Sequence, residues 1–167
     1  MTLSISKLIA TFFYTGLLRP APGSWGSAAA IPVGYLLHVA GGFPALMGAV
    51  VLVFFIGWWA TWAQTRGQDN HDPSEIVIDE VAGQWIALLP LSAGMWFAGQ
   101  DPWLFPYPGW VSAFIFFRLF DILKPGPVGW ADRKSTAFGV MLDDVIAGVM
   151  AAIVVTAAAA FSHPVLM

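Results

Sequence analysis

Apolar residues fill five stretches of the chain, and short polar or Gly/Pro-rich breaks separate them. A helix of ~20 apolar residues is long enough to cross a bilayer. Because backbone groups in lipid must be satisfied inside helices or closed barrels, we expect these stretches to be helices. The pattern predicts an all-α integral membrane bundle with about four or five membrane segments, as a single domain over residues 1–167. The stretches are 25–40, 44–63, 81–98, 109–123 and 139–161.

The lengths and ends of the stretches add detail to this prediction. Residues 25–40 and 109–123 are short, and the pattern leaves open whether they cross the bilayer fully. Most tryptophans lie near the ends of stretches, as expected for side chains that anchor helices at the membrane interface. Residues 1–18 carry one early lysine and no clear cleavage site, so we expect them to be retained, with an interfacial helix as one option.

Composition narrows the class of protein further. The 167 residues are 58% hydrophobic and 10% charged, whereas charged residues make up ~25% of an ordinary soluble domain. The net charge is −3 and no basic block is present, which argues against a nucleic-acid partner. The absence of cysteine excludes disulfides and thiolate chemistry. The chain is therefore predicted to work in a membrane, and its composition indicates no oligomeric state.

Nearly all charges fall on one side of the membrane if successive stretches alternate in direction. The breaks at 41–44 and 99–108 contain no lysine or arginine, and Asp101 is their one acidic residue. The positive-inside rule places the side with the basic residues in the cytoplasm. We therefore expect a functional site on the cytoplasmic side. The basic residues are Lys7, Arg19, Arg66, Arg118, Lys124, Arg133 and Lys134.

The first acidic group lies in the segment HDPSEIVIDEVAGQW, residues 71–85. Asp72, followed by a proline and by Glu75, is typical of a helix start, so capping explains these two residues as well as a function does. In such a helix Asp72, Glu75 and Asp79 would share one face. Capping does not explain Asp79 and Glu80, which enter an apolar stretch where carboxylates are unfavourable unless they are paired. We therefore expect Asp79 and Glu80 to be functional.

Two further charged groups lie at the end of one apolar stretch and at the start of another. Arg118, Asp121 and Lys124 follow one another at three-residue steps and form a stripe on a helix that a proline then ends. An ordinary intrahelical ion pair, with the lysine reaching the interface, is the structural alternative. Asp143 and Asp144 open the last apolar stretch; the helix dipole accounts for one of them, but adjacent residues point to different faces.

These residue types together indicate a metal-assisted phosphate site. Carboxylates without sulfur ligands suit Mg²⁺ or Mn²⁺, and Mg²⁺ commonly bridges one or two carboxylates and a substrate phosphate. The glycines and hydroxyls of residues 19–32 would let backbone amides approach a phosphate. His38, His71 and His163 are isolated in the sequence, which argues against zinc. The cations expected to bind phosphate are Arg118, Lys124, Arg133 and Lys134.

Four blocks occur in a characteristic order: GLLRPAPGSWGS (16–27), HDPSEIVIDEVAGQW (71–85), FRLFDILKPGPVGW (117–130) and GVMLDDVIAG (139–148). In these blocks the chain resembles the phosphatidylglycerophosphatase A family. The resemblance implies a Mg²⁺-dependent enzyme of the bacterial plasma membrane that removes the phosphate monoester from phosphatidylglycerophosphate and leaves phosphatidylglycerol. Ser24 keeps a hydroxyl where the family usually has threonine. The charged residues that fall on the family's motif positions are Asp72, Asp79, Glu80, Arg118, Asp121, Lys124, Asp143 and Asp144.

The resemblance also implies roles for these residues. Asp72, Asp79, Glu80, Asp143 and Asp144 are expected to bind one or two Mg²⁺ ions. Asp79, Glu80, Arg118, Lys124, Asp143 and Asp144 are expected to carry catalysis, with either water or a carboxylate as the nucleophile. Ser24, Arg118, Asp121, Lys124, Arg133 and Lys134 are expected to bind the lipid substrate. The alternative function is a small ion or proton transporter, which predicts carboxylates near the middle of long segments.

Overall fold

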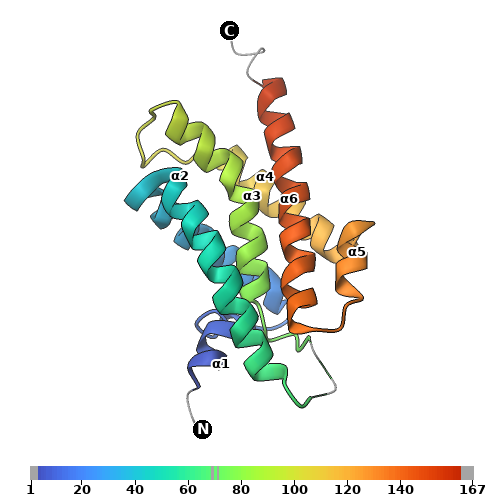
Figure 1. The fold of residues 1–167 in the computed structure, drawn as a ribbon. Helices are drawn as coiled ribbons and strands as arrows, with labels where there is room; N and C mark the ends of the chain where they lie inside the picture. The colour runs from blue at the N-terminus through green and yellow to red at the C-terminus, as the bar shows by residue number, and fades with distance from the viewer. Residues whose placement is uncertain (1–3, 69, 71, 163–167) are drawn as a thin grey trace.

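The computed structural model describes residues 4–68, 70 and 72–162, and this part of the chain contains helices and no strand (Figure 1). The all-α prediction is confirmed. The apolar stretches correspond to the long helices, whose ends lie within a few residues of the predicted ones. The elements are α1 (Ile5–Ala10), η1 (Thr15–Leu17), α2 (Pro22–Thr65), α3 (Ile78–Phe97), α4 (Tyr107–Leu123), α5 (Pro127–Asp132) and α6 (Ala137–Ser162).

Helix α2 is interrupted at a pair of glycines. Gly41 has φ −161° and ψ 19°, and Gly42 has φ 63° and ψ −154°, so neither residue is helical. Glycine is required at position 42 for two reasons. The backbone there has positive φ, which other residues rarely adopt, and an added Cβ would lie 1.8 Å from the Trp96 ring. The element therefore consists of two arms, residues 22–40 and 43–65.

The two arms of α2 run in opposite directions along α3. The first arm begins beside the start of α3, where Gly26 contacts Val77, and its far end reaches Trp96. The second arm returns, so that Gly57 lies against Ile78 at the start of α3 again. In Figure 1 the chain accordingly turns back at the upper left of the molecule. Residues 22–65 are thus a helical hairpin with α3 packed against it.

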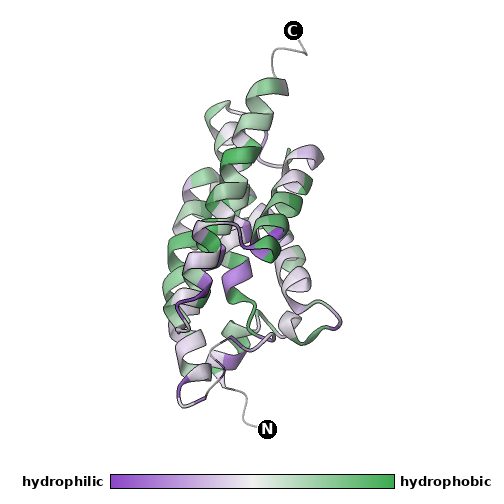
Figure 2. Ribbon diagram, turned by 90° about the vertical axis from the view of Figure 1, so that its right-hand side faces the viewer, coloured by the Kyte–Doolittle hydropathy of each residue, from purple (hydrophilic) through white to green (hydrophobic). Residues whose placement is uncertain are grey.

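Helix α3 lies at the centre of the bundle and packs against α2, α4 and α6. Its Val81 and Leu88 are fully buried, as are Phe117 of α4 and Met141 of α6. Large apolar side chains also cover the outside, where Ile153 is 64% exposed. Such a surface suits contact with lipid. In Figure 2 the long helices are mostly apolar, and the polar ribbon is concentrated toward the end that carries α1.

Two helices in the described part of the chain are long and apolar enough to cross a membrane. They are Pro22–Thr65 and Ala137–Phe161. The prediction that the chain is a membrane protein agrees with these two helices and with the apolar outer surface.

The amino-terminal stretch is less helical than the predicted option of an interfacial helix over 1–18. Helix α1 has six residues, and Phe12, Phe13 and Tyr14 then adopt positive φ, which ends it. The stretch is held by tertiary contacts, since the Gln64 side-chain amide donates to Ser6 Oγ at 2.7 Å. It therefore packs beneath the ends of α2 and α3.

The prediction of a helix start at Asp72 is wrong. The backbone N–H of Ile76 donates to Pro73 O, that of Val77 donates to Ala10 O, each at 2.9 Å, and α3 begins only at Ile78. Ile76 and Val77 are buried, so apolar packing of this loop overrides its capping pattern. Asp72 and Glu75 consequently do not share a helical face with Asp79, and Glu75 instead lies 3.9 Å from Lys7 Nζ.

Candidate active site

Two glycines bring α3 and α6 into backbone contact. A Cβ on Gly148 would lie 2.4 Å from the carbonyl oxygen of Gly83, and a Cβ on Gly83 would lie 2.6 Å from that of Asp144. Asp79 precedes Gly83 by four residues, and Asp144 precedes Gly148 by four. Residues four apart share a helix face, so both aspartates lie one turn from this crossing. The Asp-x-x-x-Gly spacing in each helix therefore directs the two carboxylates to the same place.

Asp79, Glu80 and Asp144 form the cluster that we call the acidic pocket. Each offers one carboxylate oxygen, and these oxygens all lie within 4.8 Å of one another. Asp79 is 6% exposed and Asp144 is 3% exposed. Buried carboxylates this close repel one another unless a proton or a cation lies between them. The all-oxygen donor set suits a hard divalent cation such as Mg²⁺ or Mn²⁺.

The acidic pocket also contains unpaired acceptors. Asp79 Oδ1 and Glu80 Oε2 are buried, and no residue in the described part of the chain donates a hydrogen bond to either. Buried polar atoms in proteins nearly always have a partner, and an exception calls for a ligand or water. These residues therefore fit a bound cation.

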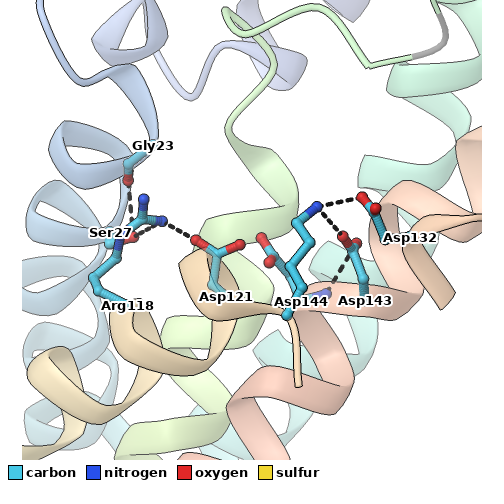
Figure 3. Close-up of polar contacts among 8 residues, drawn as sticks. Gly23, Ser27, Arg118, Asp121, Asp132, Asp143 and Asp144 are labelled. Atoms are coloured by element: carbon cyan, nitrogen blue, oxygen red, sulfur yellow. Dashed lines mark hydrogen bonds and ion pairs between the residues drawn. The ribbon is translucent and has the colours of Figure 1, made fainter. Parts of the chain in front are cut away.

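Arg118 lies beside the acidic pocket and joins α4 to α2. Its Nη1 is 2.5 Å from Asp121 Oδ2, and both side chains are 15% exposed. Nη1 also donates to Ser27 Oγ at 3.5 Å, and that hydroxyl donates to Gly23 O at 2.8 Å (Figure 3). The ion pair between Arg118 and Asp121, which the sequence left as the structural alternative, is present. Figure 3 shows the Asp121 carboxylate between Arg118 and Asp144, so this pair borders the acidic pocket.

The first turn of α2 touches the acidic pocket through Gly23. A Cβ at this position would lie 2.2 Å from Glu80 Oε1 and 3.2 Å from both terminal nitrogens of Arg118. The first N–H groups of a helix have no intrahelical partner and carry partial positive charge. Because Gly23 has no side chain, this positive end of α2 comes directly against the charged groups.

The hydroxyl that reaches Arg118 belongs to Ser27 and not to the predicted Ser24. Ser24 is half-buried, and its side chain makes no hydrogen bond to any residue that the structure describes. Sequence reasoning missed Ser27, although it lies one helical turn after Gly23 in the same stretch of small residues. That spacing was the available signal.

Lys124 forms a second polar group next to the acidic pocket. It follows α4 with φ 46°, and its Nζ donates to Asp143 Oδ2 at 3.1 Å and to Asp132. Burial alone would lower the pKa of Lys124, but the bonds to Asp132 and Asp143 outweigh it and raise the pKa above its usual value. These two carboxylates therefore favour the charged form of Lys124. Asp132 was missed by the sequence analysis, although it is the one acidic residue between Lys124 and Arg133.

The adjacent aspartates of α6 face different partners. Asp143 Oδ2 accepts the bond from Lys124, and its Oδ1 accepts one from the backbone N–H of Asp144 at 3.1 Å. Asp144 is directed into the acidic pocket. Both lie in the second turn of α6 and are buried, so stabilisation of a helix start does not explain them. Asp143 is not among the three carboxylates whose oxygens lie within 4.8 Å of one another.

The other predicted residues lie at the rim or farther away. Asp72 is exposed; its pKa is raised because water is displaced from its carboxylate, and the charge of Lys124 opposes this shift. Arg133 is exposed, and Lys134 Nζ lies 4.0 Å from the centre of the Trp130 ring. No hydrogen bond or ion pair within the described residues joins Asp72, Arg133 or Lys134 to the acidic pocket.

The histidines give no second metal centre among the described residues. His38 is buried in the first arm of α2, where its Nδ1 lies 2.8 Å from Ser92 Oγ. His71 and His163 lie outside the described residues.

Comparison with known proteins shows which family the chain resembles. A family model described as Phosphatidylglycerophosphatase A matches residues 8–159. A protein of Haemophilus influenzae named Phosphatidylglycerophosphatase A is 37% identical over 151 residues, which is 90% of this chain and 86% of that protein. An Escherichia coli protein of the same name is 35% identical over 149 residues, covering 87% of this chain and 78% of its own length.

A third relative carries a different name. A Bacteroides thetaiotaomicron protein, provisionally named a phosphatidylinositol-3-phosphatase, is 36% identical over 155 residues, covering 90% of this chain and 91% of that protein. No solved structure matches this chain. The four sequence blocks and the family match agree, and the chain belongs to the phosphatidylglycerophosphatase A family.

Proposed function

We propose that this chain hydrolyses the terminal phosphate monoester of phosphatidylglycerophosphate, which gives phosphatidylglycerol and inorganic phosphate. The observation that carries the proposal is the acidic pocket with Arg118 at its edge, in a chain of the phosphatidylglycerophosphatase A family. Buried carboxylates suit a cation, and a guanidinium suits a phosphate. The transporter alternative has no support, since the carboxylates gather at one end of the helices.

Asp79, Glu80 and Asp144 would hold Mg²⁺, and the unpaired oxygens of Asp79 and Glu80 are available as ligands. When bound, Mg²⁺ polarises phosphoryl oxygens and lowers the pKa of water. Asp72 and Asp143 were also expected to be ligands; Asp143 is held by Lys124, and Asp72 lies at the rim, so we assign them to outer positions.

The groups around the acidic pocket would bind the phosphate. Arg118 donates to the phosphoryl oxygens, and Asp121 and Ser27 fix the direction of its guanidinium. The N–H groups at the start of α2, beside Gly23, add positive potential on the same side. Charge on the equatorial oxygens grows in phosphoryl transfer, and donors that are already in place stabilise it. Lys124 donates to Asp143 and adds a second cation.

Two routes to phosphate release remain compatible with these residues. A carboxylate acts as the general base for a water that attacks phosphorus in line, or a carboxylate attacks first and water then releases it. A chiral phosphate ester distinguishes the two routes. One in-line displacement inverts the configuration at phosphorus, whereas two successive displacements retain it.

We further propose that both arms of α2 and helices α3, α4 and α6 cross a bacterial plasma membrane, with the acidic pocket at the cytoplasmic face. Helix α3, with 20 residues, is about 30 Å long, which matches the hydrocarbon thickness. Because the chain has no cysteine, single cysteines report topology cleanly. We expect Gln100→Cys to react with an impermeant maleimide in spheroplasts, and Gln68→Cys to react only after permeabilisation. The reverse pattern contradicts this orientation.

The test of function is phosphate release in detergent micelles. Wild-type protein is assayed on phosphatidylglycerophosphate, on phosphatidylinositol 3-phosphate and on soluble glycerol phosphate, with Mg²⁺ or with excess EDTA. We expect Mg²⁺-dependent release that is fastest from phosphatidylglycerophosphate. Faster release from phosphatidylinositol 3-phosphate would move the substrate assignment toward the third relative, and no release with any divalent ion would contradict the proposal.

A further inference from the structure

Gln84 of α3 is a buried amide that neither the fold nor the proposed mechanism uses. It is 0% exposed, and neither its Oε1 nor its Nε2 has a hydrogen-bond partner in the part of the chain that the structure describes. A buried amide without partners is unfavourable, because burial removes its bonds to water. A leucine would fill the same space without that penalty. A reason for an amide at this position is therefore required.

The position of Gln84 on α3 connects it to the acidic pocket. It follows Glu80 by four residues, so the two side chains lie on the same helix face. Long side chains in a helix lean toward its N-terminus, onto the residue one turn earlier. The amide of Gln84 is therefore directed toward the level of the Glu80 carboxylate.

The residues on either side of Gln84 in α3 contact other helices. Gly83 is against α6, and Trp85 Nε1 donates to Ala30 O in the first arm of α2 at 2.8 Å. Glu80 Oε2 is buried and has no donor among the described residues. A donor without an acceptor and an acceptor without a donor thus lie one helical turn apart.

Unpaired buried side-chain atoms concentrate at this place. Within the described chain they belong to five residues, and Asp79, Glu80 and Arg118 are already part of the proposed site. Gln84 lies in α3 with Asp79 and Glu80, one turn after Glu80, whereas Thr61 lies in the second arm of α2.

We propose that Gln84 is a positioning residue: the two side chains are not hydrogen-bonded in this structure, but with a cation bound to the carboxylates Gln84 Nε2 donates a hydrogen bond to Glu80 and fixes which carboxylate oxygen faces the cation. The inference rests on the proposed function, because it requires a cation in the acidic pocket. Carboxylates that bind metals are themselves held by hydrogen bonds, and loss of such a bond typically lowers metal affinity roughly 10–100-fold. Gln84 touches neither substrate nor cation; it acts through Glu80.

This role predicts opposite effects on stability and on cation binding. Gln84→Leu removes an unpaired buried amide and keeps the volume, so the cation-free protein should melt at a higher temperature. The same variant loses the bond to Glu80, so it should need roughly ten times more Mg²⁺ for half of the maximal rise in melting temperature. If Gln84 were merely structural, Gln84→Leu would lower the melting temperature of the cation-free protein and would leave the Mg²⁺ midpoint unchanged.

The experiment is thermal unfolding of the purified full chain in detergent against MgCl₂ concentration, without substrate. Gln84→Met is the second variant, in case leucine does not fold. Thr61→Val is the matched control, since it removes another unpaired buried polar atom from a different helix, and its Mg²⁺ midpoint should equal that of wild type.

The outcomes separate the two proposals. A higher Mg²⁺ midpoint in Gln84→Leu and Gln84→Met, with Thr61→Val unchanged, supports the positioning role. An unchanged Mg²⁺ midpoint in both Gln84 variants overturns the positioning role but does not contradict the Mg²⁺ site. A shift of the same size in Thr61→Val has the same meaning. If wild type shows no stabilisation by Mg²⁺, the cation assignment itself fails, and with it this inference.

Discussion

The two ends of the helix bundle use the same packing device for different purposes. At one end, Gly23 and the glycine contact between α3 and α6 let backbones approach so closely that charged side chains meet. At the other end, Gly42 lets α2 turn against the Trp96 ring. The far end also contains polar groups, yet these are paired: His38 bonds to Ser92, and Tyr35 donates to Trp103 O at 3.0 Å.

The difference is in what the buried polar atoms bond to. The His38–Ser92 pair satisfies itself and joins α2 to α3, which is a structural role. The acidic pocket has unpaired oxygens, and its repulsion is unfavourable for folding. The comparison indicates that stability dominates at the far end, and that ligand binding dominates at the pocket end. Substitutions at the two ends should therefore separate activity from stability.

The largest effect is expected for removal of one charge from the acidic pocket. Asp79→Asn and Asp144→Asn keep the side-chain shape but lose a cation ligand, so we expect phosphate release to be abolished. Because fewer buried carboxylates then repel one another, the variants should melt no lower than wild type without Mg²⁺. Release assays and melting curves check both parts. Full turnover in both variants would show that the metal assignment is wrong.

The next effect is expected at the contact between Gly23 and Glu80. Gly23→Ala places a Cβ 2.2 Å from Glu80 Oε1, so the carboxylate must move, and a displaced ligand is expected to lower kcat/KM roughly 100-fold. Gly48→Ala is the matched control, because it lies in α2 as well and its Cβ would meet nothing within 4 Å. This control should keep activity and gain slightly in stability. Equal activity of the two variants would contradict the assignment of the start of α2 to the site.

A smaller effect, on stability alone, is expected at the far end. Ser92→Ala leaves His38 Nδ1 buried without its partner, which costs about 1–3 kcal/mol. The melting temperature should fall by several degrees, while kcat of the folded fraction stays at the wild-type value. A loss of kcat that exceeds the loss of folded protein would contradict the separation of the two ends.

The smallest effect concerns the pH dependence at Lys124. The pKa of this lysine is raised above the ordinary value of about 10.4 by Asp132 and Asp143, although burial acts in the opposite direction. Because its pKa is raised, the amine stays protonated up to a higher pH than an ordinary lysine. Its charge is lost only when the pH rises above the raised pKa. Between pH 7 and 9.5 the alkaline side of the kcat/KM profile should therefore coincide in wild type and Lys124→Arg. An upward shift of that limb in the variant would show that Lys124 titrates within the range.

Much of the fold was predictable, because apolar stretches bounded by proline and glycine mark helices locally. The helix start at Asp72 was not, since burial of Ile76 and Val77 decides that loop. The charged pairs Asp79–Glu80 and Asp143–Asp144 were identified because they are unfavourable in apolar surroundings. The sequence did not show which of these carboxylates meet and which one binds Lys124, since that depends on the packing of α3 against α6.

The contact between Ser27 and Arg118 shows why other parts of the site escaped. These residues are 91 positions apart, and no local pattern marks their pairing. The repeated Asp-x-x-x-Gly spacing, by contrast, was readable in the sequence. It would have predicted that Asp79 and Asp144 meet at a close helix crossing.

The position of the acidic pocket at the ends of its helices has a consequence for biosynthesis. The hairpin of residues 22–65 contains no acidic or basic side chain except His38, so it can enter the membrane first and alone. Asp79 and Glu80 emerge next, before Arg118 and Asp144 have been made. An unpaired carboxylate in hydrocarbon is strongly unfavourable, but in the proposed membrane arrangement the start of α3 keeps it at the water boundary until its partners arrive. The order of the helices thus lets the chain insert step by step without burying an isolated charge.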